Sequence, residues 1–227
     1  MKSISRILAL VFLATATAAF THADPQRKEL VTYVDTCEAI LQEFQANPKT
    51  AIPASVLRDA KGIVIVNQFQ LGFIFGGKGG HAIAMARKPN GSWSVPCFLD
   101  TGEASVGLQL GGRTLHTVYV LNDDQGVRLL YGPKFNFGIG AKAVAGPKAA
   151  EADESTQIIK ASIYVYKKSS GLYAGANVQT GWLAPYNRAN GLFYDTTRTM
   201  PEIIFSDWIT PPAEVVPLMN YVTQITR

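Results

Sequence analysis

The hydrophobic and polar positions of the chain first follow a helical period. From residue 24 to residue 46 the apolar side chains recur at spacings of three and four, which predicts a single-faced helix. Asp24-Pro25 is expected to supply its N-cap and first residue, and Asn47-Pro48 to end it. The polar face carries four acidic and only two basic residues. We therefore expect this helix to pack on the fold and not to lie on an anionic membrane. A short second helix is predicted from Pro53 to Asp59.

The middle of the chain changes to short runs rich in β-branched and aromatic residues, separated by glycines or by Asn90-Gly91. Asn-Gly between two apolar runs is typical of a type I′ hairpin turn. A spacing of roughly ten residues per strand predicts an antiparallel, curved sheet. Ser169-Ser170-Gly171 is expected to form another tight turn. The predicted strands span residues 62–66, 72–75, 81–86, 93–99, 105–110, 117–121, 134–146, 161–168 and 171–179.

The remaining segments complete an α+β domain. A brief helical excursion is predicted at 123–132, an exposed polar loop at 148–157, and a final helix that begins at Pro211. No linker divides the chain, so residues 24–227 are expected to form one domain. Its predicted architecture is a strongly curved, glycine-rich antiparallel sheet or partial barrel, with an N-terminal amphipathic helix and a C-terminal helix.

Residues 1–23 have the pattern of a signal peptide. Lys2 and Arg6 precede an apolar run at 7–20, which is shorter than the ~20 residues needed to span a bilayer. Cleavage is expected after Ala23. The sequence thus predicts export, to a periplasmic or extracellular location peripheral to a membrane, and a retained membrane anchor is the alternative.

Charge and cysteine content narrow the possible functions. Loss of Lys2 and Arg6 from the 21 Lys and Arg leaves 19, against 17 Asp and Glu, so the mature net charge is +2. Because basic and acidic residues are nearly equal in number, a nucleic-acid partner is not expected. Cys37 and Cys97 could form a disulfide in an oxidising compartment or remain two buried thiols. Metal-ligand spacings are lacking, so neither a metal nor another cofactor is expected.

The stretch from Leu71 to Arg87 raises a question of nucleotide binding. From Gly72 it reads G-x-x-x-x-G-K-G, which departs from a phosphate-binding loop because Gly79 replaces the hydroxyl residue that holds magnesium. The pattern around it is strand, glycine turn, strand, so we expect no nucleotide. Two interpretations stay open. The glycines could simply let the sheet bend, or Lys78 and free backbone N–H groups could form an anion-binding concavity.

Residues 60–112 and several later motifs resemble the SYLF domain, a lipid-binding family that includes the yeast actin-binding proteins of endocytic patches. The resemblance covers about residues 30 to 200 and implies binding of phospholipids, which are phosphoinositides in eukaryotic members. The chain departs from the family pattern at Tyr173, where phenylalanine is frequent, and at Asp195, where glycine is frequent. The matching features are Lys61-Gly62, Gly72-Phe73, Gly76 to Gly80, Gly91-x-Trp93-Ser94-x-Pro96, Gly107-x-Gln109-x-Gly111, Gly146-Pro147, Tyr166 to Gly175, Asn190 and Phe193-Tyr194.

We therefore predict a non-catalytic protein that binds an anionic phospholipid membrane through basic, glycine-rich turns. Enzymatic activity is not expected, because His81 and His116 are the only neutral-pH bases of the mature chain and no nucleophile motif accompanies them. A scaffolding module that binds an envelope protein is the alternative. The predicted headgroup residues are Lys78, Gly77, Gly79, Arg87, Lys88, Arg113, Lys167 and Lys168.

Overall fold

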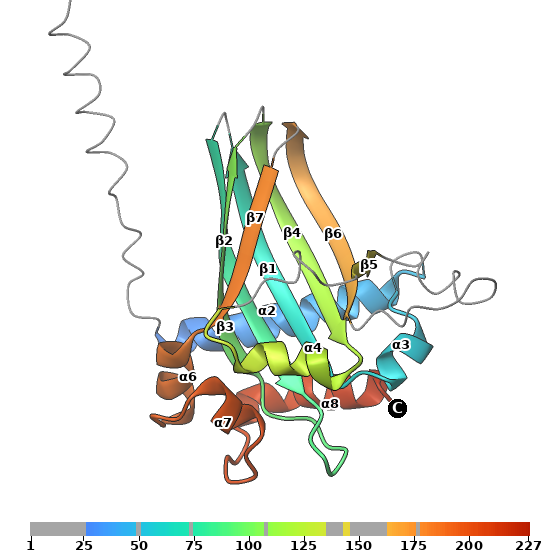
Figure 1. Ribbon diagram of the computed structural model, residues 1–227, viewed down its shortest axis with the longest axis vertical. Coiled ribbons are helices and arrows are strands. Elements are labelled where there is room, and N and C mark those ends of the chain that lie inside the picture. Colours follow the sequence, from blue (N-terminus) through green and yellow to red (C-terminus); the bar gives the residue numbers. More distant parts are fainter. Residues whose placement is uncertain are drawn as a thin grey trace, which may run out of the picture.

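The computed structural model describes residues 26–48, 51–72, 75–106, 109–134, 143–145, 163–175 and 178–227. Seven strands form one sheet in the order β5-β6-β4-β1-β2-β3-β7, with helices on both faces (Figure 1). The strands are β1 (Gly62–Gly72), β2 (Phe75–Ala86), β3 (Cys97–Val106), β4 (Gln109–Leu121), β5 (Ala143–Ala145), β6 (Ile163–Gly175) and β7 (Val178–Pro185). The helices are α2 (Arg27–Ala46), α3 (Ala54–Arg58), α4 (Asp124–Arg128), η1 (Leu129–Tyr131), α6 (Asn187–Tyr194), α7 (Met200–Ile204), η3 (Ala213–Val215) and α8 (Val216–Ile225).

These elements confirm the predicted α+β class, the curved antiparallel sheet and the two terminal helices, and they show that the sheet is not closed. Every strand pairs antiparallel except β5, which pairs parallel with β6. The predicted loop at 148–157 lies outside the described residues. Two helices, α6 and α7, were not predicted, because no sustained helical period marks residues 187–204.

Helix α2 confirms the predicted period and corrects its start. Gln26 is the N-cap, and its backbone N–H donates to Glu29 at 3.1 Å in a capping box. The expected N-cap at Asp24 is therefore wrong, because the glutamine–glutamate pair satisfies the first turn. Asn47 ends the helix as predicted. The buried side chains of α2 are Leu30, Val34, Cys37, Ile40, Leu41 and Phe44.

The long strands correct two predicted turns. Residues 76–80, which carry four glycines, lie inside β2, where Lys78 is opposite Gln70 of β1 and Glu103 of β3. Residues 169–171 likewise lie within β6 and pair with β4. Glycine and serine often form turns, but pairing with neighbouring strands can hold them extended: residues 76–80 pair on both sides, and residues 169–171 pair with β4. The loop expected around Lys78 is thus a central strand.

The loop after β2 contains the Asn90-Gly91 turn, in a different geometry from the one predicted. Gly91 has φ 86°, whereas Asn90 has a negative φ, so a type I′ turn is excluded. The N–H of Gly91 donates to the carbonyl of Lys88 at 2.8 Å. Only one bridge, Arg87 to Trp93, joins the two sides of the loop. Strand β3 consequently begins at Cys97 and not at residue 93.

The sheet curls toward a partial barrel at the end opposite this loop. Gly175 of β6 and Val178 of β7 are three residues apart, a reach of about 10 Å. In the sheet order, however, β4, β1, β2 and β3 lie between β6 and β7. Five flat interstrand steps would cover about 24 Å. The strands must therefore draw together there, as their upper ends do in Figure 1.

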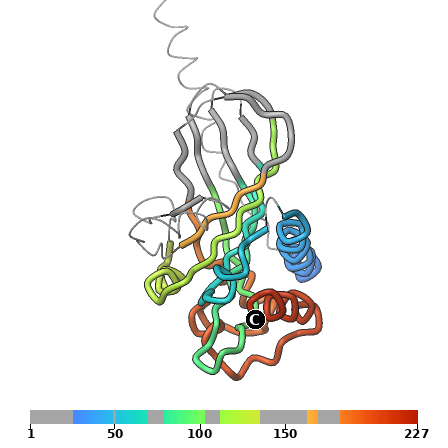
Figure 2. Tube along the Cα trace, turned by 90° about the vertical axis from the view of Figure 1, so that its right-hand side faces the viewer, coloured from blue at the N-terminus to red at the C-terminus, as the bar shows by residue number. Residues whose placement is uncertain are grey.

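Two hydrophobic cores occupy the two faces of the sheet. Helices α2, α6 and α8 cover one face, and α7 with η1 covers the other (Figure 2). Cys37 lies in the first core and Cys97 in the second, and both are free thiols. Their separation by the sheet rules out the disulfide left open by the sequence. Burial raises the pKa of both thiols. No helix in the described ranges combines the length and the hydrophobicity that crossing a bilayer requires.

Candidate anion-binding groove

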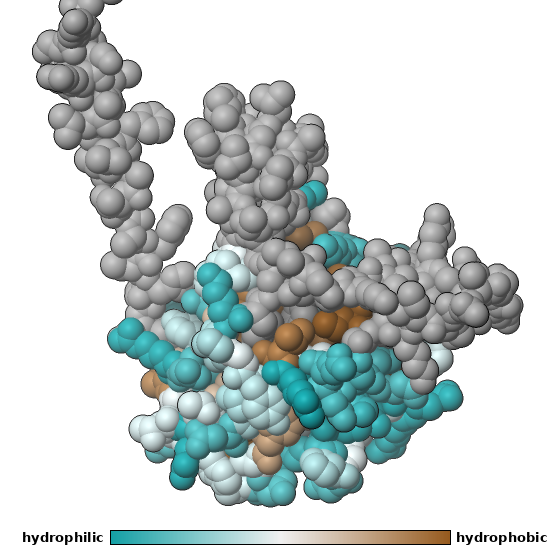
Figure 3. Space-filling model, viewed as in Figure 1, coloured by the Kyte–Doolittle hydropathy of each residue, from teal (hydrophilic) through white to brown (hydrophobic). Residues whose placement is uncertain are grey.

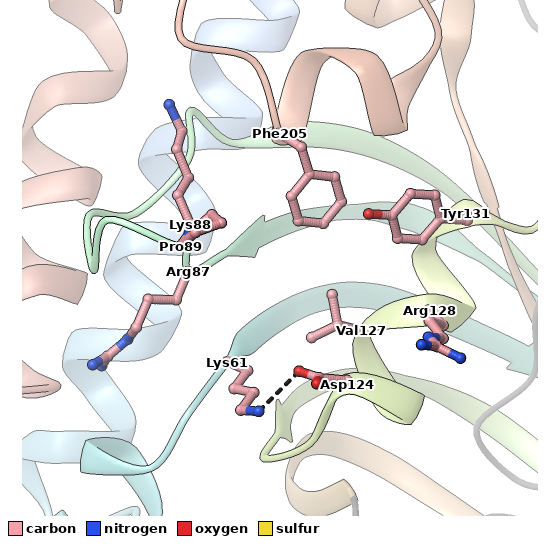
Figure 4. A pocket seen from close by; sticks show the side chains of 9 residues that line it. All are labelled: Lys61, Arg87, Lys88, Pro89, Asp124, Val127, Arg128, Tyr131 and Phe205. Carbon is pink, nitrogen blue, oxygen red and sulfur yellow. Dashed lines mark hydrogen bonds and ion pairs between the residues drawn. The ribbon is translucent and has the colours of Figure 1, made fainter.

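A groove of about 450 Å³ lies at the end of the sheet where β1 begins and where β2 and β4 end (Figure 4). Backbone hydrogen bonds set its frame. The N–H of Lys61 donates to the carbonyl of Leu121 at 2.8 Å, and the N–H of Arg87 donates to the carbonyl of Lys61 at 2.8 Å. Residues from three strand ends thus meet here. We call the site the basic groove; it is lined by Lys61, Arg87, Lys88, Pro89, Asp124, Val127, Arg128, Tyr131 and Phe205.

Positive charge dominates this lining. Four cationic side chains and one carboxylate line the groove, and Asp207 beside it pairs with Lys88, which leaves a net charge of +2. Lys61 Nζ lies 2.8 Å from Asp124 Oδ1, and this hydrogen bond lowers the pKa of Asp124, which keeps the carboxylate ionised. Asp124 is largely exposed. The groove therefore presents an excess of positive charge to water, which favours an anionic ligand.

Two of the cations are tied to neighbouring segments. Lys88 Nζ donates to the Ser206 carbonyl at 2.6 Å and lies 2.9 Å from Asp207 Oδ1. Arg87 donates to the Thr226 carbonyl at 3.1 Å, while its Nε is buried without a hydrogen-bond partner in the described chain. Figure 4 shows these two side chains turning away from each other. Positive charge is thus spread around the rim of the groove and is not focused on one point.

Aromatic side chains form part of the groove wall and also lie on the surface next to it. The rings of Tyr131 and Phe205 stack with centroids 5.0 Å apart, and Tyr131 is 54% exposed. Burial raises the pKa of Tyr131, although Arg128 opposes this. Trp208, 56% exposed, follows the Asp207 that pairs with Lys88. Aromatic residues beside cations are common where proteins meet the membrane–water interface. The surrounding surface over α4 is largely hydrophilic (Figure 3).

The groove gathers only two of the predicted headgroup residues, Arg87 and Lys88. Lys78 lies in β2 and Arg113 in β4, each opposite Gln70 of β1, so these two share one row of the sheet. Gly77 and Gly79 flank Lys78 in the same strand. The side chain of Lys78 lies outside the described part of the structure. A strand position does not offer the free backbone N–H groups of the expected concavity, because its ladder partners use them.

The last two predicted residues point to opposite faces of β6. Lys168 Nζ lies 2.5 Å from Glu43 of α2, whereas Lys167 is exposed on the other face. His116 Nδ1 lies 3.3 Å from the same Glu43 carboxylate, and together these contacts lower the Glu43 pKa, with Lys168 as the larger cause. Lys168 therefore joins α2 to the sheet.

His81 is also occupied by the fold. Its ring stacks on that of Tyr33, with centroids 3.8 Å apart and 5° between the planes. Burial lowers the pKa of His81 to about 4, so the ring is neutral at physiological pH. A neutral ring beneath α2 cannot supply charge to an anion. Nor do any three His, Cys, Asp or Glu side chains of the described residues come together as a metal-binding group.

Sequence reasoning missed most of the groove. Lys61 was noted only as part of a motif, and Arg128, Tyr131 and Phe205 were not singled out at all. Arg87 and Lys88 stood out because they follow a strand and precede a turn. Nothing local to Lys61 or Arg128 indicates that β1 and β4 pair so that these residues meet. The pairing of Gly62 with Leu121, 59 positions apart, brings the segments that carry Lys61 and Arg128 to the same end of the sheet.

Several motif residues quoted above serve packing instead of forming the groove. The side-chain amide of Asn190, fully buried, accepts from the Phe98 N–H at 2.7 Å and donates to the Phe98 carbonyl at 3.0 Å. The Tyr194 hydroxyl donates to the Pro96 carbonyl at 2.5 Å. Trp93 Nε1 donates to Thr226 Oγ1 at 2.9 Å. These bonds fasten α6 and the C-terminal end of the chain to the start of β3.

Comparison with known proteins shows which family the chain is similar to. Residues 102–225 match the family described as Ysc84, Las17-binding protein actin regulator. The bovine SH3 domain-containing YSC84-like protein 1 is 30% identical over 195 residues, which is 83% of this chain and 57% of that protein. The LAS seventeen-binding protein 3 of Saccharomyces cerevisiae is 33% identical over 174 residues, 74% of this chain and 38% of that protein.

A third relative, Protein YSC84 of Saccharomyces cerevisiae, is 32% identical over 167 residues, which cover 71% of this chain and 36% of that protein. The chain thus spans about two fifths to three fifths of the length of these curated relatives. No solved structure matches the chain.

Proposed function

The chain belongs to the Ysc84 (SYLF) family, and on this premise we propose that it is a non-catalytic protein that binds anionic phospholipid surfaces. The bound headgroup is of the phosphoinositide type or another phosphate-bearing anion. The observation that carries the proposal is the basic groove, where a net charge of +2 lies beside the exposed ring of Tyr131, and where Asp207, paired with Lys88, is followed by the exposed Trp208. Cations attract the leaflet over a Debye length, and aromatic rings enter the interface at short range.

This end of the molecule fits a membrane better than α2 does. The apolar face of α2 is already buried in the first core, and its exposed side carries more acidic than basic residues. Release of α2 would expose that core to water. The groove and Trp208 need no such rearrangement, because both already face solvent.

We expect the chain to co-sediment with phosphatidylcholine vesicles that contain phosphatidylglycerol, and less so at high salt. Arg128→Glu should weaken binding about tenfold or more, because each charge near the leaflet changes affinity by roughly fivefold. Trp208→Ala should weaken it as well.

Matched controls test whether the contact is local. Lys28→Glu makes the same charge change on α2, and Phe69→Ala removes an equally exposed ring, 52% exposed, from the far half of β1. Neither should weaken binding. Equal binding to vesicles without phosphatidylglycerol would contradict the proposal, and so would equal losses in Lys28→Glu and Arg128→Glu.

A protein partner is the second candidate function. One observation favours it: two of the relatives are named for binding to LAS seventeen or for an SH3 domain. Under this alternative the chain is a scaffolding module, and affinity capture should return one protein in stoichiometric yield, unaffected by Arg128→Glu.

We further propose that residues 1–23 direct export and that the chain acts peripherally on a membrane in the periplasm or outside the cell.

A further inference from the structure

We propose that the basic groove is a phosphate-ester site in which the phosphate of the ligand replaces the carboxylate of Asp124 beside Lys61. This inference depends on the proposed function in one respect only, which is that a lipid headgroup is one of the possible sources of the phosphate. It assigns a ligand class and a competing internal group to a defined place in the fold. The exchange is non-covalent: one anion leaves the ammonium group of Lys61 and another takes its position.

The Lys61–Asp124 pair is the observation that carries this inference. The two side chains are 2.8 Å apart at the bottom of the view in Figure 4, with Val127 above them. Both are substantially exposed, at 48% and 75%. An exposed ion pair contributes little to stability, so Asp124 can turn into solvent at small cost. Lys61 would then offer three donors to an incoming oxyanion.

The rest of the lining suits a phosphate ester better than a bare inorganic ion. Arg128 adds a second charge, and a phosphate monoester carries a charge of about −1.5 to −2 that two cations would balance. Val127, Pro89 and the Tyr131–Phe205 stack give the groove apolar walls, against which the carbon part of an ester can pack. A volume of about 450 Å³ is within the usual range for small-molecule sites.

The charge on the phosphate of the ligand is expected to decide which esters this site prefers. The groove is bounded by α4 on one side and by the loop after β2 on the other. A terminal phosphate that enters between them carries a charge of about −1.5 to −2, whereas a phosphodiester carries a single negative charge. We therefore expect monoesters to bind more tightly than diesters.

The test uses glycerol 3-phosphate as the probe, with the full chain and isothermal titration calorimetry at constant ionic strength. Asp124→Asn removes the competing carboxylate and should tighten binding severalfold. Lys61→Met removes the cation and should weaken binding about fivefold. Asp35→Asn, the same substitution on the exposed side of α2, should leave the affinity unchanged. Acetate should not bind at matched concentration.

The direction of the Asp124→Asn effect decides the inference. Weaker or unchanged binding in this variant would overturn it, as would full binding in Lys61→Met.

A second experiment identifies the source of the phosphate. If glycerol 3-phosphate displaces the chain from anionic vesicles, lipid headgroup and free ester share the groove. If it binds the groove without displacing the vesicles, the inference stands for a free ester and the groove fails as the lipid contact. If vesicles bind and glycerol 3-phosphate does not, the inference fails and lipid binding stands.

Discussion

Gly80→Ala is expected to lower the free energy of unfolding by about 3 kcal/mol or more. A Cβ at position 80 would lie 2.1 Å from the carbonyl oxygen of Asn67 and 2.8 Å from the Cα of Gln68. Both are backbone atoms of the neighbouring strand β1, so neither can turn aside as the tip of a long side chain could. The sheet itself must open, next to the packed Tyr33–His81 rings. Chemical denaturation followed by circular dichroism measures the loss.

Gly79→Ala is the matched control for this prediction. A Cβ at position 79 has no atom within 4 Å, and the residue is exposed. We expect its free energy of unfolding to change by less than about 1 kcal/mol. Equal effects of the two substitutions would contradict the described course of β2, because adjacent glycines of a loop would not differ in this way.

Asn190→Ala is expected to cost about 2 to 4 kcal/mol of unfolding free energy. Strand β7 ends at Pro185, opposite Leu99, and the amide of Asn190 continues the ladder to Phe98. Alanine would leave the buried N–H of Phe98 without an acceptor. The Phe98 carbonyl would still accept a hydrogen bond from the N–H of Tyr186, at 3.0 Å, so only the Phe98 N–H would lose its partner. The same denaturation experiment measures the change.

The control for this variant lies on the same helix. Asn187→Ala alters an exposed side chain at the first residue of α6 and should change stability by less than about 0.5 kcal/mol. If Asn190→Ala is as mild as Asn187→Ala, α6 is not held by this amide. Vesicle binding by folded Asn190→Ala should remain, because the residue does not line the groove.

Helices with a clear period could be predicted from the sequence, and strand boundaries could not. The spacing of Leu30, Val34, Cys37 and Leu41 has one structural meaning, because only a helix places them on one face. A glycine run such as 76–80 is ambiguous locally, since the same residues form a turn or a crowded strand. Which one forms depends on strands distant in sequence. The 2.1 Å approach at Gly80 shows why glycine is needed without any turn.

The backbone conformation at Asp195 explains one position where the chain departs from the family pattern. Asp195 ends α6 with φ 49° and ψ 55°, a left-handed conformation that glycine adopts without strain. A glycine at this position, which the family resemblance led us to expect, would adopt the same C-cap conformation. Aspartate is among the few other residues that tolerate this region. The sequence alone shows an aspartate at position 195, but it does not show that the residue has a left-handed backbone conformation.

The groove could be predicted only in part, because it is assembled from three strand ends. Lys61 precedes β1, Arg87 follows β2, and Arg128 follows β4. Only the register that pairs β1 with β2 and with β4 brings them together. Phe205 depends on α7, which has no clear period of its own. Basic residues chosen for their place near glycines were instead distributed along β2, β4 and β6.

Paramagnetic relaxation is the most direct test of membrane contact at the basic groove. The ¹⁵N-labelled chain would be bound to phosphatidylglycerol nanodiscs that carry a spin label on the lipid headgroup. We predict that the amide signals of Lys61, Lys88, Arg128 and Trp208 lose intensity, while those of α2 keep it. Attenuation centred on α2, or on Arg113 and Lys167 with the groove unaffected, would contradict membrane binding through this end of the sheet.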